Sequence, residues 1–335
     1  MAEAGPCAIG GGCNSGANIQ PVTPLAVITN RLSTRNRSAE KWIDPLLAGE
    51  QGVIHVAIEG IAQVDDAIRR CAQAGARVIV VNGGDGTAGL VFGALLNGSP
   101  YADPPALALL PGGKTNMTAA AWSLKGDATQ ALKDVLALQS AGTLEAHTTR
   151  RSVMSVRDGD SPARYGAFFG AADIVEGILF CRRHIYPLNM PNAASHTAAM
   201  SLLLWRSLFA GGDSKPILLS QGDEELPGGK FFVFVATTLD RLILDLKPMP
   251  PASAGNGALV YASVDHKPLA ILRALPDVLR RRLRPGKGRN VGRAENLCLR
   301  FTGAYTIDGE MYETSADRDL ILDSRDTLRF IQLKV

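Results

Sequence analysis

The chain has 335 residues, a length that predicts two globular domains and a core large enough to fold without disulfides or structural metals. Its residues are 46% hydrophobic and 20% charged with a formal net charge of +3, which excludes a disordered chain and a nucleic-acid binder that relies on bulk charge. The cysteines form no C-x-x-C pair, and no apolar run reaches the roughly 18 residues of a membrane-spanning helix. We therefore expect a cytoplasmic protein that does not cross a bilayer.

Residues 1–20 have neither the basic nor the apolar region of a secretory signal, so they are expected to form a flexible tail. Beyond them, short apolar runs alternate with amphipathic helical patterns, which is typical of a parallel sheet in an α/β domain. Strands are predicted at residues 25–30, 53–58, 76–82 and 106–110, and helices at 60–75, 88–96 and 128–138. These elements predict a first domain at residues 21–143.

After residue 144, apolar runs are separated by glycine and proline turns, which predicts an antiparallel β-rich second domain at residues 144–318. A final strand is expected within residues 319–335, with a return to the first domain as one option. Helices are expected at residues 174–183, 193–209 and 268–284. The string LPGGK at Leu226–Lys230 precedes an apolar run and is interpreted as a hairpin turn.

A glycine-rich segment, VNGGDGTAG at Val81–Gly89, lies where an apolar strand gives way to a helix. Backbone N–H groups and a helix N-terminus can converge on phosphate oxygens at such a turn. Its residues Gly84–Gly89 also fit G-x-G-x-x-G, so a nicotinamide-dependent reductase is an alternative, although the match follows the third predicted strand and not the first.

A second loop, LPGGKTNMT at Leu110–Thr118, again follows a strand and precedes a helical run. Lys114 would supply a mobile positive charge there, and Thr115 and Asn116 would supply hydrogen bonds. Two such loops on neighbouring strand ends predict a phosphate-binding cradle.

The segment Gly83-Gly84-Asp85-Gly86-Thr87 resembles the nucleotide loop of the diacylglycerol kinase catalytic superfamily, which includes bacterial lipid kinases, sphingosine kinases and ceramide kinases. Three more motifs of that family have similar counterparts in the same order: Asn30 with Ser33, Pro111–Asn116, and Asp308-Gly309-Glu310. The resemblance implies an NAD-kinase-like three-layer α/β domain, an antiparallel β-rich C-terminal domain, and a nucleotide in the cleft between them. It implies nucleotide binding by Asn30, Ser33, Gly83, Gly84, Asp85, Gly86, Thr87, Pro111, Gly112, Gly113, Lys114, Thr115 and Asn116.

The activity implied is transfer of the γ-phosphoryl group of ATP to a lipid hydroxyl, with Mg²⁺. Phosphoryl transfer needs positioning, charge neutralisation and a carboxylate that accepts the hydroxyl proton, and Asp85 and Glu310 are the candidates for that carboxylate. Asp85 and Asp308 are the candidate Mg²⁺ ligands. Lys114 and Thr115 replace the family's Thr-Gly pair and Met117 replaces a frequent acid, so a non-catalytic nucleotide-binding relative is also considered. Gly255-Asn256-Gly257 lacks the carboxylate of the family's structural metal loop, and no such metal is predicted.

Asp173 bears on the choice of lipid, because Ala172-Asp173-Ile174 is similar to a sequence of sphingosine and ceramide kinases whose Asp contacts the sphingoid headgroup. A carboxylate there could accept hydrogen bonds from a 3-hydroxyl, an amide N–H or an amine, a set of donors that diacylglycerol does not have. The other interpretation makes Asp173 the N-cap of the helix that it opens.

A basic segment at Arg273–Arg293 contains eight Lys or Arg residues against one acid, Asp277, with an apolar stripe at Leu272, Leu275, Leu279 and Leu283. It could dock on anionic headgroups, or be an ordinary surface helix whose stripe faces the core.

We therefore predict an ATP-dependent lipid kinase, peripherally associated with the inner membrane surface, that phosphorylates the primary hydroxyl of its lipid. Ceramide or a sphingoid lipid is slightly favoured over diacylglycerol, and an NAD kinase-like enzyme or a nicotinamide-dependent reductase is the alternative. A homodimer is left open, and no nucleic-acid partner is expected.

Overall fold

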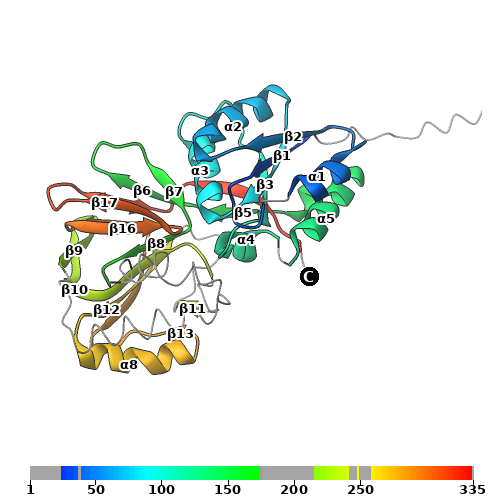
Figure 1. Ribbon diagram of the computed structural model, residues 1–335. Coiled ribbons are helices and arrows are strands. Elements are labelled where there is room, and N and C mark those ends of the chain that lie inside the picture. Colours follow the sequence, from blue (N-terminus) through cyan, green and yellow to red (C-terminus); the bar gives the residue numbers. More distant parts are fainter. Residues whose placement is uncertain are drawn as a thin grey trace, which may run out of the picture.

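The computed structural model of the protein (Figure 1) describes residues 24–36, 39–124, 126–173, 175, 215–240, 247–248 and 258–333. The predicted N-terminal tail, nearly all of the helices predicted at 174–183 and 193–209, and Gly255–Gly257 lie outside the described residues. Within the described part of the chain, every helix is too short or too polar to cross a membrane.

The first domain is built on a six-stranded sheet with the strand order β2-β1-β3-β4-β19-β5. All its strands run parallel except β5, which pairs antiparallel with β19. β1, β3 and β4 are buried along their whole length, as expected for strands that are covered on both faces. The strands are β1 (Leu25–Asn30), β2 (Val53–Ile58), β3 (Val78–Gly83), β4 (Ala106–Pro111), β5 (Thr148–Ser152) and β19 (Thr327–Ile331).

Helices cover both faces of this sheet and enclose two separate apolar cores, which makes three layers (Figure 1). Residues of α2, α3 and α4 pack into one core, and residues of α1 and α5 pack into the other. The helices are α1 (Glu40–Leu47), α2 (Val64–Gln73), α3 (Asp85–Leu96), α4 (Met117–Trp122) and α5 (Ala128–Ser140). α3 begins at Asp85, three residues before the predicted start, so the Asp-Gly-Thr of the glycine-rich loop forms its first turn.

The second domain is an antiparallel sheet with the order β17-β16-β8-β10-β9-β15-β18-β6-β7, in which β12 joins β10 to β14. α8 (Pro268–Leu279) packs against it, and β11 (Lys247–Pro248) and β13 (Arg282–Leu283) form a short pair beside the helix. α8 ends five residues before the predicted end. The sheet strands are β6 (Met154–Asp158), β7 (Arg164–Gly166), β8 (Phe168–Ala171), β9 (Pro216–Gln221), β10 (Glu224–Thr237), β12 (Leu259–Asp265), β14 (Arg289–Ala294), β15 (Asn296–Arg300), β16 (Gly303–Ile307), β17 (Glu310–Thr314) and β18 (Leu320–Asp323).

The LPGGK string at Leu226–Lys230 is not the hairpin turn that the sequence predicts. It lies inside β10, and the turn between β9 and β10 comes earlier, at Gly222 and Asp223. The β9–β10 register shifts between Leu226 and Gly229, and a Cβ on Gly228 would lie 2.7 Å from the Ile217 carbonyl oxygen. The string is therefore a bulge at which β10 bends, so that its first half pairs with β9 and its second half with β8 and β12.

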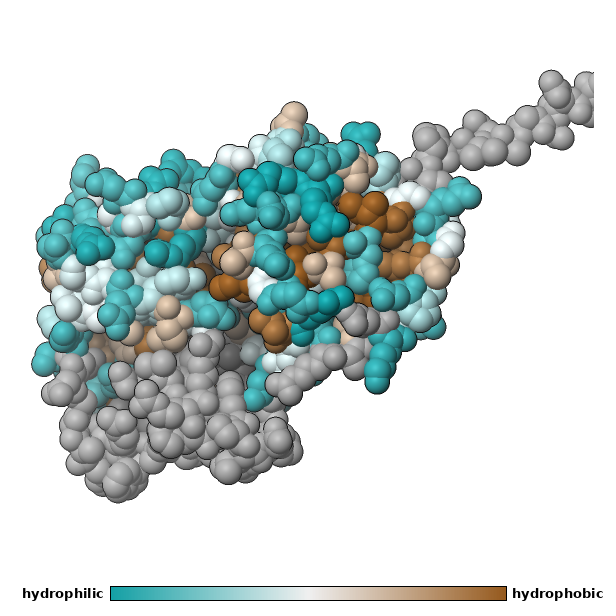
Figure 2. Space-filling view, turned by 45° about the horizontal axis from the view of Figure 1, so that its top comes forward, coloured by the Kyte–Doolittle hydropathy of each residue, from teal (hydrophilic) through white to brown (hydrophobic). Residues whose placement is uncertain are grey.

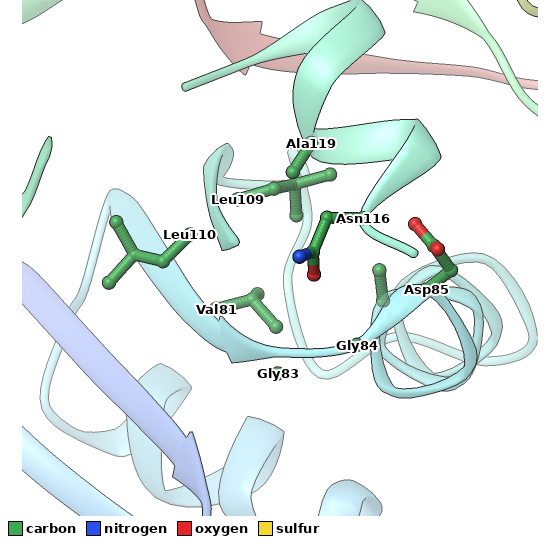
Figure 3. Close-up of a pocket in the computed structure, with 9 residues that line it drawn as sticks. Val81, Gly83, Gly84, Asp85, Leu109, Leu110, Asn116 and Ala119 are labelled. Atoms are coloured by element: carbon green, nitrogen blue, oxygen red, sulfur yellow. The ribbon is translucent and has the colours of Figure 1, made fainter. Parts of the chain in front are cut away.

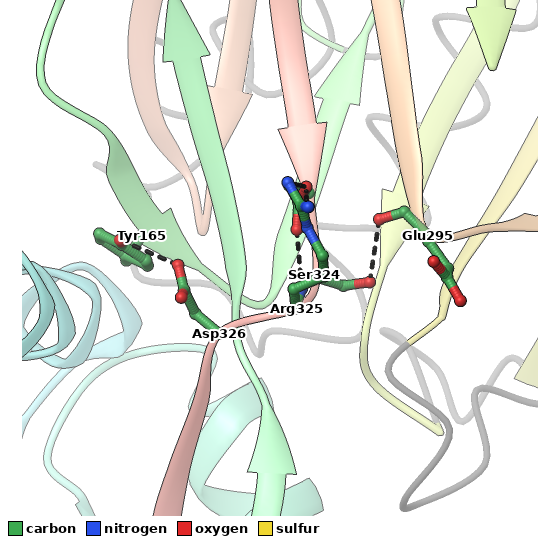
Figure 4. Close-up of polar contacts among 6 residues, drawn as sticks. Tyr165, Glu295, Ser324, Arg325 and Asp326 are labelled. Atoms are coloured by element: carbon green, nitrogen blue, oxygen red, sulfur yellow. Dashed lines mark hydrogen bonds and ion pairs between the residues drawn. The ribbon is translucent and has the colours of Figure 1, made fainter. Parts of the chain in front are cut away.

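The chain crosses between the two sheets twice, so the first sheet extends beyond the boundary predicted at residue 143. β5 leads out of the first sheet into β6, while β18 lies in the second sheet and β19 returns to the first. At the return, the Tyr165 hydroxyl donates to Asp326 (3.0 Å) and the Ser324 hydroxyl donates to the Glu295 carbonyl (3.3 Å) (Figure 4).

On the face in Figure 2, hydrophobic residues gather on the first-domain side and hydrophilic residues predominate on the second-domain side.

Candidate functional site

The two glycine-rich loops lie against each other at the carboxyl ends of β3 and β4, as the sequence predicts. A Cβ on Gly113 would lie 2.5 Å from the Cα of Gly84, and one on Gly112 would lie 2.7 Å from Oδ1 of Asn82. Both distances are shorter than any tolerated contact, so glycine is required for the loops to meet as well as for a ligand to approach the backbone.

The Asp85 side chain is hydrogen-bonded to the end of the second loop. Its carboxylate accepts hydrogen bonds from the backbone N–H of Thr118 (3.0 Å) and of Met117 (3.1 Å) at the start of α4. The side chain is buried, and desolvation raises the pKa of Asp85 although these backbone donors oppose the change. Asp85 therefore joins the first turn of α3 to the first turn of α4.

Asn116 shapes the second loop from within. Its φ of 53° is left-handed, its Oδ1 accepts from the Gly113 N–H (2.7 Å), and its Nδ2 donates to the Gly113 carbonyl (2.8 Å). Asp85 and Asn116 border a small pocket over Val81, Leu109 and Ala119 with room for little more than a water molecule (Figure 3). The amide of Asn116, predicted to bind phosphate, thus holds the loop in shape.

Asparagine side chains brace the ends of β1 and β3. Nδ2 of Asn30 donates to the Thr87 hydroxyl (2.9 Å), which links β1 to the first turn of α3. Nδ2 of the buried Asn36 donates to the carbonyls of Asn30 (3.0 Å) and Asn82 (2.8 Å). Asn36 is not among the predicted site residues, and its one signal in the sequence is an amide side chain three positions after Ser33.

The Asp308-Gly309-Glu310 motif forms the turn between β16 and β17, with positive φ at Asp308 (48°) and Gly309 (87°), as a tight hairpin requires. The Asp308 carboxylate accepts from the N–H of Phe168 (2.9 Å) and of Ala167 (3.0 Å). Desolvation, and next to it the charge of Asp85, raise the pKa of Asp308 well above its usual value. A Cβ on Gly89 would lie 3.8 Å from Oδ2 of Asp308, so Asp308, from the second domain, lies beside the helix that begins at Asp85.

Glu310 reaches the first loop from the second domain. A Cβ on Gly86 would lie 3.1 Å from both Cγ and Oε1 of Glu310, so this side chain lies directly over the first turn of α3. Glu310 is exposed, whereas Asp85 is buried. The two candidate carboxylates thus occupy one site but have different surroundings.

Glycines at three- and four-residue spacing on α3 let the second domain approach this helix. A Cβ on Gly89 would lie 2.6 Å from the Tyr165 carbonyl oxygen of β7, and the aromatic ring of Tyr165 lies beside Gly93. The last glycine of the G-x-G-x-x-G match therefore allows the close contact between α3 and β7 of the second domain.

The remaining predicted phosphate contacts surround these residues. Lys114 and Ser33 are half-buried and Thr115 is exposed, and their roles stay predictions. Among the described residues, no group of three or more His, Cys, Asp or Glu side chains could hold a metal ion. Asp85 and Asp308 could hold Mg²⁺ only together with other oxygen ligands, which the phosphates of a nucleotide would supply.

Asp173 lies two residues beyond the end of β8, after Ala172 with a φ of 69°. Its Oδ2 is 2.8 Å from Nδ1 of His266, and both side chains are mostly buried, with exposed fractions of 16% and 13%. His266 comes from the loop that joins β12 to α8. The sequence contains no signal that pairs these residues, because 93 positions separate them.

Comparisons with known proteins agree with this geometry. Residues 24–145 match the sequence family described as the diacylglycerol kinase catalytic domain. No curated protein matches the chain.

Similar folds occur among solved structures. A diacylglycerol kinase structure from Bacillus anthracis str. Sterne has a TM-score of 0.62 and 14% identity over 93% of this chain and 97% of its own. Another structure from that organism reaches a TM-score of 0.68 at the same identity and coverage. Yeast NADH kinase complexed with NADH has a TM-score of 0.52 and 10% identity over 94% of this chain and 85% of its own.

These likenesses confirm the predicted fold class, an NAD-kinase-like α/β domain followed by an antiparallel β-rich domain. The sequence match confirms the resemblance that the motifs indicated. Residues 24–145 thus match the diacylglycerol kinase catalytic domain, and the fold of the whole chain is similar to that of a diacylglycerol kinase structure.

Proposed function

We propose that the protein transfers the γ-phosphoryl group of ATP to the primary hydroxyl of a membrane lipid, with Glu310 as the base. One observation carries this proposal: the exposed carboxylate of Glu310, from the second domain, lies over Gly86 in the first turn of α3. A nucleotide held by the first domain and a hydroxyl held by the second would meet at that carboxylate.

In the proposed reaction, the lipid hydroxyl oxygen attacks the γ-phosphorus, the bond from that phosphorus to the β–γ bridging oxygen breaks, and ADP leaves. Glu310 accepts the hydroxyl proton. Backbone N–H groups at the N-terminus of α3 would bind the phosphates, and Lys114 would add a positive charge. Mg²⁺, which the kinase family implies, would be held by Asp85 and Asp308 with the help of phosphate oxygens, and its charge would offset the negative charge of these groups.

The two candidate bases can be separated by isosteric variants. Glu310→Gln is expected to lower kcat by about 100-fold or more, which is the usual contribution of a general base, and to leave the unfolding midpoint unchanged because the side chain is exposed. Asp85→Asn is expected to lower the unfolding midpoint, because one amide oxygen cannot replace a carboxylate that accepts from two N–H groups.

The measurements are transfer of radiolabelled phosphate from ATP to micellar lipid and thermal unfolding of each variant. Full activity of Glu310→Gln together with an inactive but stable Asp85→Asn would assign the base to Asp85 and contradict the proposal. Inactivity of the wild-type chain toward every lipid would contradict the proposed reaction itself.

For the lipid, we propose ceramide or a sphingoid base ahead of diacylglycerol. The support is the position of Asp173, a mostly buried carboxylate that follows β8, the strand whose first residue, Phe168, bonds Asp308. A carboxylate at that place can accept hydrogen bonds from the amide, the amine or the 3-hydroxyl of a sphingoid lipid, whereas diacylglycerol has only the one hydroxyl that is phosphorylated.

The test offers ATP, Mg²⁺ and micellar ceramide, sphingosine or diacylglycerol in parallel to the wild-type chain and to Asp173→Ala. Turnover is expected to be higher with the sphingoid lipids, and the variant is expected to lose that difference by raising KM for them alone. Equal losses on all three lipids would make Asp173 a structural residue, and turnover of diacylglycerol alone would make the protein a diacylglycerol kinase.

A further inference from the structure

We infer that the outer face of α8 and the basic residues that follow it form a docking surface for an anionic phospholipid membrane. This α8 surface combines exposed apolar and basic side chains. It consists of Leu269, Leu272, Arg273, Val278, Leu279, Arg280, Arg281, Arg282, Arg284 and Lys287. It deepens the proposed function, because a membrane is where the lipid substrate would be found.

The burial of α8 differs from that of an ordinary surface helix. Its inner face consists of Ala270, Ile271 and Ala274, which pack against Phe232 and Val264 of the sheet. The larger leucines point outward: Leu269 is 57% exposed, Leu272 is 49% exposed and Leu279 is 82% exposed. Two members of the stripe that the sequence predicts are thus exposed, and a helix with its larger apolar residues outward indicates a surface that is covered by a partner.

The charges identify the partner. Basic side chains lie exposed on and beyond the last turns of the helix, at Arg273, Arg280, Arg281, Arg282, Arg284 and Lys287. The one acid of the segment, Asp277, is mostly buried and forms an ion pair with Arg289 of β14. Leucines flanked by cations suit a bilayer whose anionic headgroups pair with the arginines while the apolar side chains enter the acyl boundary.

The α8 surface also lies close in the chain to a residue of the proposed lipid site. Lys267 and His266 immediately precede α8, and His266 holds Asp173 at 2.8 Å. The backbone N–H of His266 donates to the Lys230 carbonyl (2.9 Å), which fixes the start of the helix to β10. In Figure 1, α8 lies on the side of the second domain that faces away from the first-domain sheet. Docking through α8 would therefore bring a bilayer to the second domain and leave the nucleotide loops free.

The experiment measures cosedimentation of the full chain with vesicles of phosphatidylcholine alone and with added phosphatidylglycerol. Binding is expected only with the anionic lipid and is expected to weaken as salt is raised. A basic residue at an anionic surface strengthens binding about fivefold, so Arg280→Glu/Arg284→Glu is expected to weaken it at least about 25-fold. Leu272→Gln/Leu279→Gln is expected to weaken it at least about tenfold, through lost apolar burial.

Matched controls use exposed residues elsewhere. Leu218→Gln on β9, where the side chain is 63% exposed, and Lys133→Glu on α5 are expected to bind as the wild type does. Phosphate transfer to lipid in detergent micelles is measured in parallel, and the α8 variants are expected to retain it. Absent or lipid-independent vesicle binding, or equal losses in the controls, would overturn the docking surface, whereas inactivity on micelles with intact docking would contradict only the proposed function.

Discussion

The contact of α3 with β7 predicts opposite effects for two alanine substitutions in one helix. Gly89→Ala would place a Cβ 2.6 Å from the Tyr165 carbonyl oxygen, and this backbone atom cannot move without displacing β7. Gly93→Ala would place a Cβ 3.9 Å from the Tyr165 ring, at an ordinary van der Waals distance. We expect the first variant to destabilise the protein and the second to stabilise it.

The magnitudes follow from two terms. Alanine is favoured over glycine inside a helix by about 1 kcal/mol, and this gain applies equally to both positions. Insertion of a methyl group into a packed contact costs about 1–3 kcal/mol, and only Gly89→Ala incurs that cost. The gain cancels in the comparison, so the two variants should differ by about 1–3 kcal/mol in the free energy of unfolding.

Urea and thermal unfolding of the wild type and both variants provide the measurement. For domains of this size a difference of 1 kcal/mol corresponds to roughly 2–4 °C in Tm. Gly89→Ala should also lower kcat for phosphate transfer, because a shift of β7 would move Glu310 away from the first loop. If Gly89→Ala is as stable as Gly93→Ala, the close approach of the two domains at this helix is refuted.

Two further predictions concern buried polar groups. Burial raises the pKa of Asp308, so the folded protein binds a proton at this carboxyl more tightly than the unfolded chain does. The stability that this group contributes is therefore present below the unfolded pKa and is lost as the pH rises through the folded pKa. Asparagine tolerates the left-handed φ of this position, so Asp308→Asn should fold and should show a smaller decline of the urea midpoint above pH 4. An unchanged slope would contradict the raised pKa of Asp308. Asn36→Ala should cost about 1–3 kcal/mol, because it leaves the Asn30 and Asn82 carbonyls without a donor. It should also raise the KM for ATP, whereas unaltered stability and KM would show that these bonds do not brace the loops.

Several elements are predictable from sequence because their cause is local. The strands at residues 25–30 and 53–58 have the predicted bounds, since an apolar run between turn residues has few other ways to bury itself. The motifs indicate the resemblance that the match over residues 24–145 confirms, because glycines beside a strand end impose strict backbone requirements.

The roles of the site residues depend on contacts between distant segments. The carboxylate of Asp85 bonds N–H groups more than 30 positions away, and Glu310 meets Gly86 across the two domains. The LPGGK string is similar to part of the second nucleotide loop, yet it bends a strand, because β9 and β12 pair with different halves of β10.

By itself, the sequence determined the α/β and β-rich halves, the positions of the glycine loops and the resemblance to the diacylglycerol kinase catalytic domain, since these follow from local patterns of apolar residues and glycine. Only the tertiary structure decided that the Asp85 carboxylate is buried against the second loop and that the Glu310 carboxylate is exposed over the first. It also decided that the leucines of α8 face outward. The physical reason is that burial and the pKa of a side chain depend on which segments pack against it, and no local pattern encodes that packing.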